Sequence, residues 1–204
     1  MCFNAEVSIS TYILGLIGSF ILYKKGYPKE AILYFFVIQM QLIEYFLWKN
    51  QTCNSFNKFI TKIGIILNHL QPIILYLLIK YFNDGQSFIL PKWLDLFMVI
   101  FVIMTIYYTK YVMNDDCSLI TVESNPHIEW LWNNKNYGGI YYLLFILIVV
   151  LLTYYGLSNG KLHSAIILIG YVISYLIYNK KKSVGSIWCF YAAFAPWLLT
   201  FLYK

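Results

Sequence analysis

The chain has 204 residues, of which 60% are hydrophobic, 12% are charged and 20% are aromatic. Soluble globular domains carry about 25% charged residues, so this composition excludes an ordinary soluble enzyme or binding domain. The net charge of +6 comes from lysines scattered among the polar stretches, without the basic face and interleaved aromatic residues of a nucleic-acid groove. We therefore expect a membrane protein whose lysines meet the headgroups of the lipid bilayer and which binds no nucleic acid.

Seven apolar stretches predict the architecture. Most approach the roughly 20 residues that an α-helix needs to cross a hydrocarbon core about 30 Å thick. The short alternating stretches of a transmembrane barrel strand are absent from the sequence, and helices satisfy their own backbone groups in lipid. The prediction is an all-α polytopic transmembrane helical bundle of seven helices, with six as the fallback count, in one domain over residues 1–204. The helices are expected at about 7–23, 31–48, 59–82, 93–113, 140–155, 162–178 and 186–203, with a long loop at 114–139.

The second and third stretches contain ionisable residues, which normally face a partner or a water-filled cavity when they lie inside a bilayer. In 31–48, one helical face carries Tyr34, Gln41, Glu44 and Trp48. In 59–82, His69 lies ten residues into the helix, about 15 Å deep at about 1.5 Å per residue and so near the midplane. Pro72 is expected to kink this helix and to free the carbonyl of Asn68 beside His69.

The long loop and the last stretch complete the candidate positions. The loop holds His127, Glu129, Trp130 and Trp132, a run that we expect to lie in the membrane interface with its tryptophans at headgroup level and His127 solvated. The last stretch has a stripe of mostly small residues, which lets helices approach closely. The stripe is Ser186, Cys189, Ala193, Pro196 and Thr200. The same stretch has no lysine for a Schiff base, which excludes a retinal photoreceptor.

The fifteen lysines divide almost evenly between the two sides, so the positive-inside rule does not decide orientation. Two signals favour an extracytoplasmic N-terminus: the sequon Asn50-Gln51-Thr52, and a disulfide that could join Cys53 to Cys117 in loops on the same side. The alternative is a chance tripeptide and two unpaired thiols.

Four short motifs resemble those of a family of uncharacterised bacterial and giant-virus multi-pass membrane proteins, which begin with Met-Cys-Phe-Ser-Ala and carry Trp-Cys-Phe in the last helix. The resemblance implies a shared multi-pass architecture and a focus on these polar positions; it implies no particular activity. Asn4 departs from the family's usual serine. The motifs are Met1-Cys2-Phe3-Asn4-Ala5 with Ser8, Gln41-x-x-Glu44-x-x-x-Trp48, His69-x-x-Pro72, and Ser186-x-Trp188-Cys189-Phe190.

Cys2, Glu44, His69 and Cys189 are predicted to converge on a polar pocket that opens toward the N-terminal side. These residue types bind zinc or another transition metal. A metal with an open position could activate water against a lipid-like substrate, with Glu44 and His69 as the catalytic residues. The first hypothesis is therefore a metal-dependent hydrolase of lipid-like substrates.

Two alternatives remain open. Glu and His near the midplane suit a proton-coupled small-solute carrier or channel. In a non-catalytic structural membrane protein, Glu44 and His69 would instead bond one another or the carbonyl freed by Pro72, and Cys189 would pack as a small apolar residue. His163 lies at the opposite membrane boundary and is not expected to join the pocket.

Overall fold

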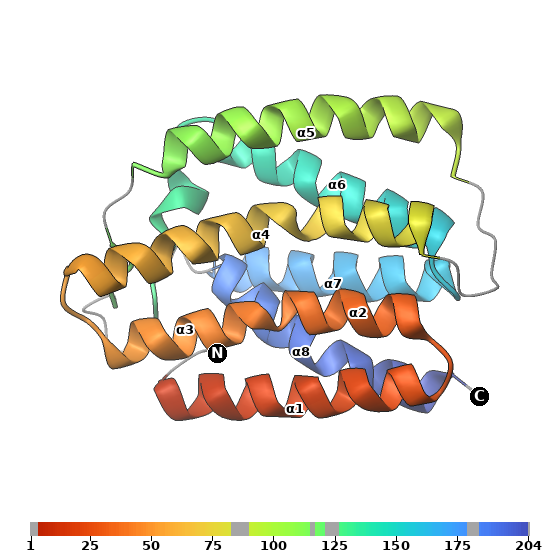
Figure 1. The fold of residues 1–204 in the computed structure, drawn as a ribbon, viewed down its shortest axis with the longest axis horizontal. Helices are drawn as coiled ribbons and strands as arrows, with labels where there is room; N and C mark the ends of the chain where they lie inside the picture. The colour runs from red at the N-terminus through yellow and green to blue at the C-terminus, as the bar shows by residue number, and fades with distance from the viewer. Residues whose placement is uncertain (1–3, 83–89, 115–116, 121–126, 179–183, 204) are drawn as a thin grey trace.

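The structure is a computed structural model, and it describes residues 4–82, 90–114, 117–120, 127–178 and 184–203. Helices that run back and forth along one common direction make up the bundle (Figure 1). The helices are α1 (Ala5–Lys24), α2 (Pro28–Val37), α3 (Gln39–Lys49), α4 (Ser55–Tyr81), α5 (Lys92–Val112), α6 (Gly138–Gly156), α7 (Gly160–Tyr178) and α8 (Val184–Leu202), with a short 3-10 helix η1 (Leu131–Asn134).

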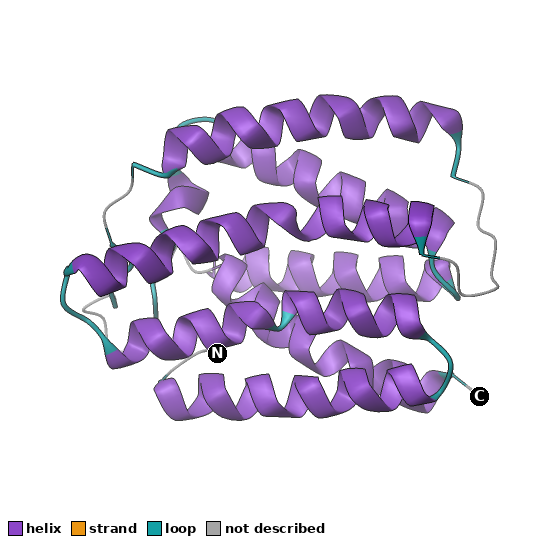
Figure 2. Cartoon of the chain, viewed as in Figure 1, coloured by secondary structure: helices purple, strands orange, loops and turns teal. Residues whose placement is uncertain are grey.

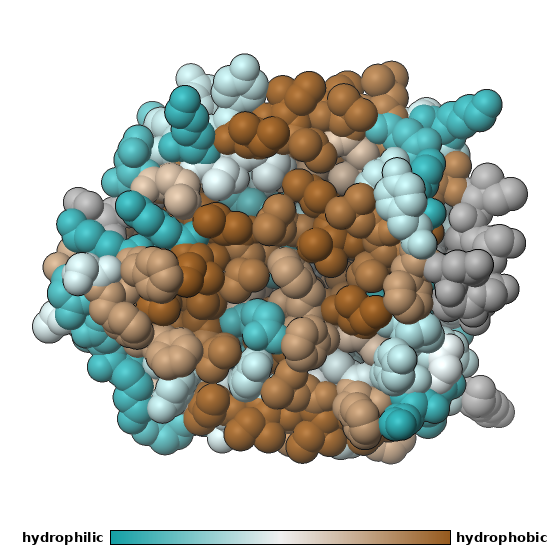
Figure 3. All heavy atoms as spheres, viewed as in Figure 1, coloured by the Kyte–Doolittle hydropathy of each residue, from teal (hydrophilic) through white to brown (hydrophobic). Residues whose placement is uncertain are grey.

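The predicted fold class is confirmed. Within the described residues, six helical segments are long and apolar enough to cross a membrane, α2 and α3 counting as one segment. The stretch Ile187–Leu202 of α8 is apolar but shorter, so that seven helical segments make up the bundle. Brown, apolar side chains cover most of the middle of the visible face, and teal, polar ones gather toward its two ends (Figure 3). This arrangement is the one that a bilayer requires.

The prediction of one continuous helix over 31–48 is wrong, because the helix is interrupted at Ile38. Figure 2 shows this interruption as a short teal segment between α2 and α3. Gln41 N–H bonds the Ile38 carbonyl, three residues back, which tightens the backbone locally. The amide of Gln39 donates to the Phe35 carbonyl at 2.8 Å and so satisfies an acceptor at the interruption. As a result, Tyr34 lies on a different helix from Gln41 and Glu44.

Helix α1 packs along α8. Gly15 lies against Ile38 and the carbonyl of Ala193, and Gly18 lies against Pro196 and the ring of Trp197. A side chain at either glycine would meet these neighbours, so the small residues are what lets the helices approach. At Ala193 and Pro196 the predicted stripe of α8 is therefore in contact with α1.

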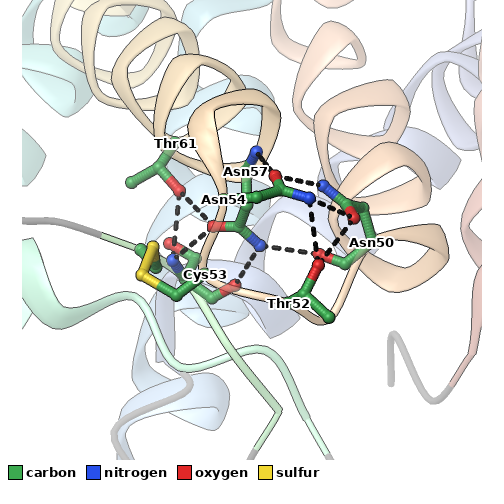
Figure 4. Close-up of a disulfide and its surroundings, with 8 residues drawn as sticks. Asn50, Thr52, Cys53, Asn54, Asn57 and Thr61 are labelled. Atoms are coloured by element: carbon green, nitrogen blue, oxygen red, sulfur yellow. Dashed lines mark hydrogen bonds between the residues drawn. A yellow bond between two sulfur atoms is a disulfide. The ribbon is translucent and has the colours of Figure 1, made fainter.

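The two ends of the bundle differ. We call the end that carries the start of α1 and the α3–α4 connection the disulfide end, because Cys53 and Cys117 are joined there with a Cα–Cα distance of 5.6 Å. Figure 4 shows the surrounding hydrogen bonds. The side-chain amide of Asn57 accepts from Ser118 N–H and donates to the Ser118 carbonyl, both at 3.1 Å, which is the pair of bonds that the backbone of an adjacent β-strand would make. The loop is therefore held to α4 by one covalent bond and by paired hydrogen bonds.

The predicted place of the two loop tryptophans is wrong. Trp130 and Trp132 are fully buried, with ring centroids 5.0 Å apart, and Tyr108 of α5 donates to the Trp132 carbonyl at 2.5 Å. His127, which we expected in a solvated loop, is also buried. The disulfide holds the loop against the bundle end, so these apolar rings pack into the protein core and are not exposed at the surface.

Candidate functional site

A cavity of about 590 Å³ lies at the disulfide-end half of the bundle, between α4, α6, α7 and α8. This volume is within the usual range for small-molecule sites, about 300–1,000 Å³. Its walls are mainly apolar and aromatic. The lining residues are Asn68, Lys135, Gly138, Gly139, Tyr142, Leu143, Phe145, Ile146, Tyr171, Tyr175, Val184, Gly185 and Trp188.

Asn68 and Tyr142 supply the polar floor of this cavity. Asn68 Nδ2 donates to Tyr142 Oη at 3.0 Å, and the same oxygen lies 3.0 Å from Nε2 of His69. His69 Nδ1 lies 2.7 Å from Thr109 Oγ1 on α5. Because the phenol oxygen accepts from Asn68, its own hydrogen can be donated to Nε2, and His69 then donates from Nδ1 to Thr109. Three helices are thus joined by one network behind the cavity.

An aromatic wall fixes His69 in this position. Its ring centroid lies 5.0 Å from that of Tyr141, and Tyr141 stacks on Tyr108 at 4.3 Å. Thr105 and Tyr141 share a hydrogen bond at 3.2 Å. These bulky rings leave His69 1% exposed, so it acts on the cavity through Tyr142. Tyr142 is therefore the residue that both contacts His69 and would face a ligand in the cavity.

The structure places Glu44 and Cys189 in one neighbourhood. Both are buried, and Glu44 interacts electrostatically with the Cys189 thiol. Gln41 donates to Glu44 Oε2 at 3.2 Å, as the shared face of the sequence suggested. Cys189 also interacts electrostatically with Tyr142, which relates this neighbourhood to the cavity floor.

The predicted four-residue metal site stays a prediction. Among the described residues, no three His, Cys, Asp or Glu side chains come together in a way that could hold a metal ion. Both ring nitrogens of His69 are occupied by hydroxyl partners, which leaves neither directed at Glu44 or Cys189. Cys2 lies outside the described residues. Glu44, His69 and Cys189 do not fit a zinc site, which needs three or four converging protein ligands, because the ring of His69 is directed at other partners.

The non-catalytic alternative predicted that His69 could bond Glu44. The structure shows other partners for its two ring nitrogens, Thr109 and Tyr142. Helix α4 continues through Pro72 without interruption. Because Pro72 has no N–H, the carbonyl of Asn68 lacks its usual helical donor. The part of Asn68 that belongs to the site is its side chain, which donates to Tyr142.

A second cluster of polar side chains lies at the opposite end, which we call the His163 end. Tyr34 Oη lies 3.1 Å from His163 Nδ1, and His163 Nε2 bonds Tyr203 Oη. Tyr203 Oη donates to the Ser158 carbonyl at 2.8 Å, and Ser158 N–H donates to Glu30 Oε1 at 3.0 Å. All five residues are buried or half-buried. As predicted, His163 stays apart from the pocket on the N-terminal side.

Reasoning from the sequence missed several residues of both clusters. Tyr142 and Thr109 lie in stretches rich in tyrosine or apolar residues, and nothing in their spacing separates them from lipid-facing neighbours. Glu30 has a usable signal, because a proline followed by an acidic residue, as in Pro28-Lys29-Glu30, is typical of the start of a helix. In the structure Glu30 is 1% exposed. Sequence reasoning had set its helix to begin at 31 and so left Glu30 in a loop.

Comparison with protein-family models finds no match for this chain. Comparisons with curated proteins and with solved structures find no match either.

Proposed function

We propose that this multi-pass membrane protein binds a lipid-like ligand with one acyl chain and a neutral hydrogen-bonding group in the cavity of about 590 Å³. The observation that carries the proposal is the combination of mainly apolar walls with a floor of the neutral polar groups of Asn68 and Tyr142, Lys135 being the charged residue of the lining. Few polar groups in a mainly apolar cavity are typical of sites that orient a ligand. The hydrocarbon chain would lie along the apolar wall, and a hydroxyl or carbonyl would meet the floor.

Titration of the detergent-purified protein with a fluorescent monoacylglycerol tests this proposal. Tyr142→Phe keeps the ring and removes one hydrogen-bonding group, so we expect about tenfold weaker binding, equivalent to about 1.4 kcal/mol. Asn68→Leu should weaken binding by a similar factor. Tyr107→Phe is the matched control, since Tyr107 is 73% exposed on the outer face of α5.

Absence of saturable binding to the wild-type protein would contradict the proposal and favour a non-catalytic structural role. Binding that is equal in the wild type and in both floor variants would show that the molecule binds elsewhere. Retained folding of each variant is checked by thermal unfolding in the same detergent.

We also infer that the disulfide end, and with it the N-terminus, faces an extracytoplasmic or lumenal compartment. Disulfides persist in oxidising compartments and are rare where thiols are kept reduced, and Cys53 and Cys117 are paired at that end. Asn50, the first residue of the sequon, lies beside the disulfide (Figure 4). Its side chain accepts from Thr52 at 3.2 Å.

Labelling of sealed vesicles of known orientation tests this inference. In a Cys2→Ser background, after treatment with a membrane-impermeant reductant, an impermeant polyethylene-glycol maleimide should add to both Cys53 and Cys117 when their end faces outward, and should add once when Cys53→Ser is also present. Labelling only after the vesicles are opened would assign the opposite orientation.

A further inference from the structure

The cluster at the His163 end lies outside the cavity of the proposed ligand, and the hydrogen bonds within it all point in one direction. Tyr203 donates its hydrogen to the Ser158 carbonyl, so Tyr203 Oη is the acceptor from His163 Nε2–H. Nδ1 of the neutral ring then has no hydrogen and accepts from Tyr34 Oη. Every hydrogen in the chain Tyr34, His163, Tyr203 therefore points from the bundle interior toward its end.

The interior end of this chain borders a small cavity. Tyr34 and Gln71 both line a space of about 30 Å³, which exceeds the volume that one water molecule needs. Gln71 is 2% exposed, and both atoms of its amide have no hydrogen-bond partner among the described residues. A buried amide without partners is costly, and turning this amide toward the small space, whose walls are otherwise almost entirely apolar, would let it bond a water molecule there.

Trp188 separates this small cavity from the large one. It lines both cavities and packs edge-on against Phe145, with ring centroids 6.1 Å apart. The large cavity lies on the disulfide-end side of this ring, and Gln71 and Tyr34 lie on the other side of it. Rotation of a single side chain would connect the two spaces.

The outer end of the chain lies among charged groups. Glu30 accepts from Ser158 N–H and interacts electrostatically with both Tyr34 and Tyr203. Lys25 Nζ bonds the carbonyls of Thr200 and Tyr203 close by. Lys29, which is 2% exposed, precedes Glu30 on α2. A carboxylate beside the last hydroxyl supplies an acceptor for a proton that reaches this end.

We propose that Gln71, Tyr34, His163, Tyr203 and Glu30 form a proton-conducting path from the large cavity to the His163 end. A water molecule at Gln71 that takes up a proton from the large cavity gives one to Tyr34 Oη, and the proton of Tyr34 passes to Nδ1 of His163. Nε2 then gives its proton to Tyr203 Oη, whose own hydrogen turns away from the Ser158 carbonyl and passes to Glu30 or to water at the bundle end. One proton enters and one leaves, and rotation of the hydroxyls with return of the ring to its first tautomer restores the starting arrangement.

Proton flux into liposomes tests the path. The purified protein is reconstituted with an internal pH-sensitive dye, and a potassium gradient with valinomycin drives proton entry. The wild type should exceed protein-free liposomes by at least tenfold. Tyr203→Phe and Tyr34→Phe keep the aromatic packing but each removes one hydroxyl of the relay, so each should lower the flux at least tenfold. Tyr107→Phe, on the exposed face of α5, should match the wild type.

Wild-type flux equal to that of protein-free liposomes would overturn the proposal, and so would wild-type flux in Tyr203→Phe. His163→Phe is an additional variant, and should it fail to fold, the two tyrosine variants still decide the question. Monoacylglycerol binding is measured on the same samples and should be unchanged in Tyr203→Phe. Failure of the proton path and failure of the ligand site are thereby distinguishable.

Discussion

Two buried histidines occupy similar local environments and differ in what lies next to them. His69 and His163 are 1% and 0% exposed, and each places both ring nitrogens against hydroxyl groups from other parts of the chain. Around His69 the hydroxyls end at a cavity of about 590 Å³. Around His163 they continue as a directed chain to a carbonyl and a carboxylate. The two histidines therefore differ in proposed role because of their surroundings: His69 lies behind the floor of a ligand cavity, and His163 lies within a chain of hydrogen bonds that could carry a proton.

The two ends are also held differently. At the disulfide end a covalent bond and the pairing of Asn57 with Ser118 fix the loop over the core. At the His163 end the described contacts of the cluster are hydrogen bonds and ring packing, such as that of Tyr27 on Tyr203 at 4.2 Å. Stability of the first end should depend on redox state, and stability of the second should not.

The largest expected effect comes from removing the ring between the two regions. Trp188→Ala should lower the free energy of unfolding by about 3–5 kcal/mol, because a buried ring is lost and the two cavities merge. Equilibrium unfolding in mixed micelles measures this. Trp93→Ala is the control, since Trp93 is 50% exposed. Equal losses in the two variants would show that Trp188 does not hold the two regions apart.

Breaking the disulfide should have the next largest effect. Cys53→Ser with Cys117→Ser should lower the free energy of unfolding by about 2–4 kcal/mol, since the bond closes a loop with a sequence separation of 64 residues. A reductant should reproduce the loss in the wild type and change nothing in the double variant. Hydrogen exchange should rise near Trp130 and stay constant near His163. A uniform rise at both ends would contradict the difference between them.

Replacing each histidine sharpens the comparison directly. His69→Phe and His163→Phe should each lower the free energy of unfolding by about 1–3 kcal/mol, because each removes the hydrogen bonds to two hydroxyls. The loss should be larger for His163→Phe, since Tyr142 is half-buried and can turn its hydroxyl toward the large cavity, whereas Tyr34 and Tyr203 are buried. Unfolding curves of the two variants in one detergent compare them. A larger loss of unfolding free energy for His69→Phe would contradict the view that the His69 cluster lies beside an open cavity while the His163 cluster is closed.

The smallest effect is expected at the half-exposed ion pair of Lys80 and Asp95, 2.7 Å apart and each 35% exposed. Asp95→Asn should lower the free energy of unfolding by roughly 0.2–1 kcal/mol, the range typical of exposed pairs. Both clusters should keep their properties, so ligand binding and proton flux should match the wild type. A loss above that range would mean that Tyr76, which also donates to Asp95, carries a larger share of the stability.

Much of the fold could be predicted from the sequence because the spanning helices leave a direct signal. Apolar stretches of about membrane thickness located every helix to within a few residues, as comparison of 59–82 with Ser55–Tyr81 illustrates. The interruption at Ile38 has no comparable signal, since no Pro or Gly marks it. The loop tryptophans were misplaced because interfacial tryptophan is the usual case for membrane proteins, and only the tethered loop explains their burial.

The candidate site could be predicted in part. Asn68 and His69 were recognised as polar residues inside the bilayer, and both belong to the network at the cavity. Glu44 and Cys189 lie close enough to interact electrostatically, while the four-residue site predicted from them stays a prediction. The hydroxyl partners of His69 were not recognised, because Tyr142 and Thr109 lie on helices far apart in the sequence, and spacing along one helix carries no information about contacts between helices.

The sequence by itself determined that this chain is a polytopic helical membrane protein with a few ionisable side chains inside the bilayer, because hydrophobicity and helix length act locally along the chain. Only the tertiary structure decided which polar groups meet. Helix packing closed one histidine into a chain with Tyr34 and Tyr203 and left the other beside an open cavity. That outcome depends on helix order, rotation and the fit of rings such as Trp188, which no single stretch of sequence specifies.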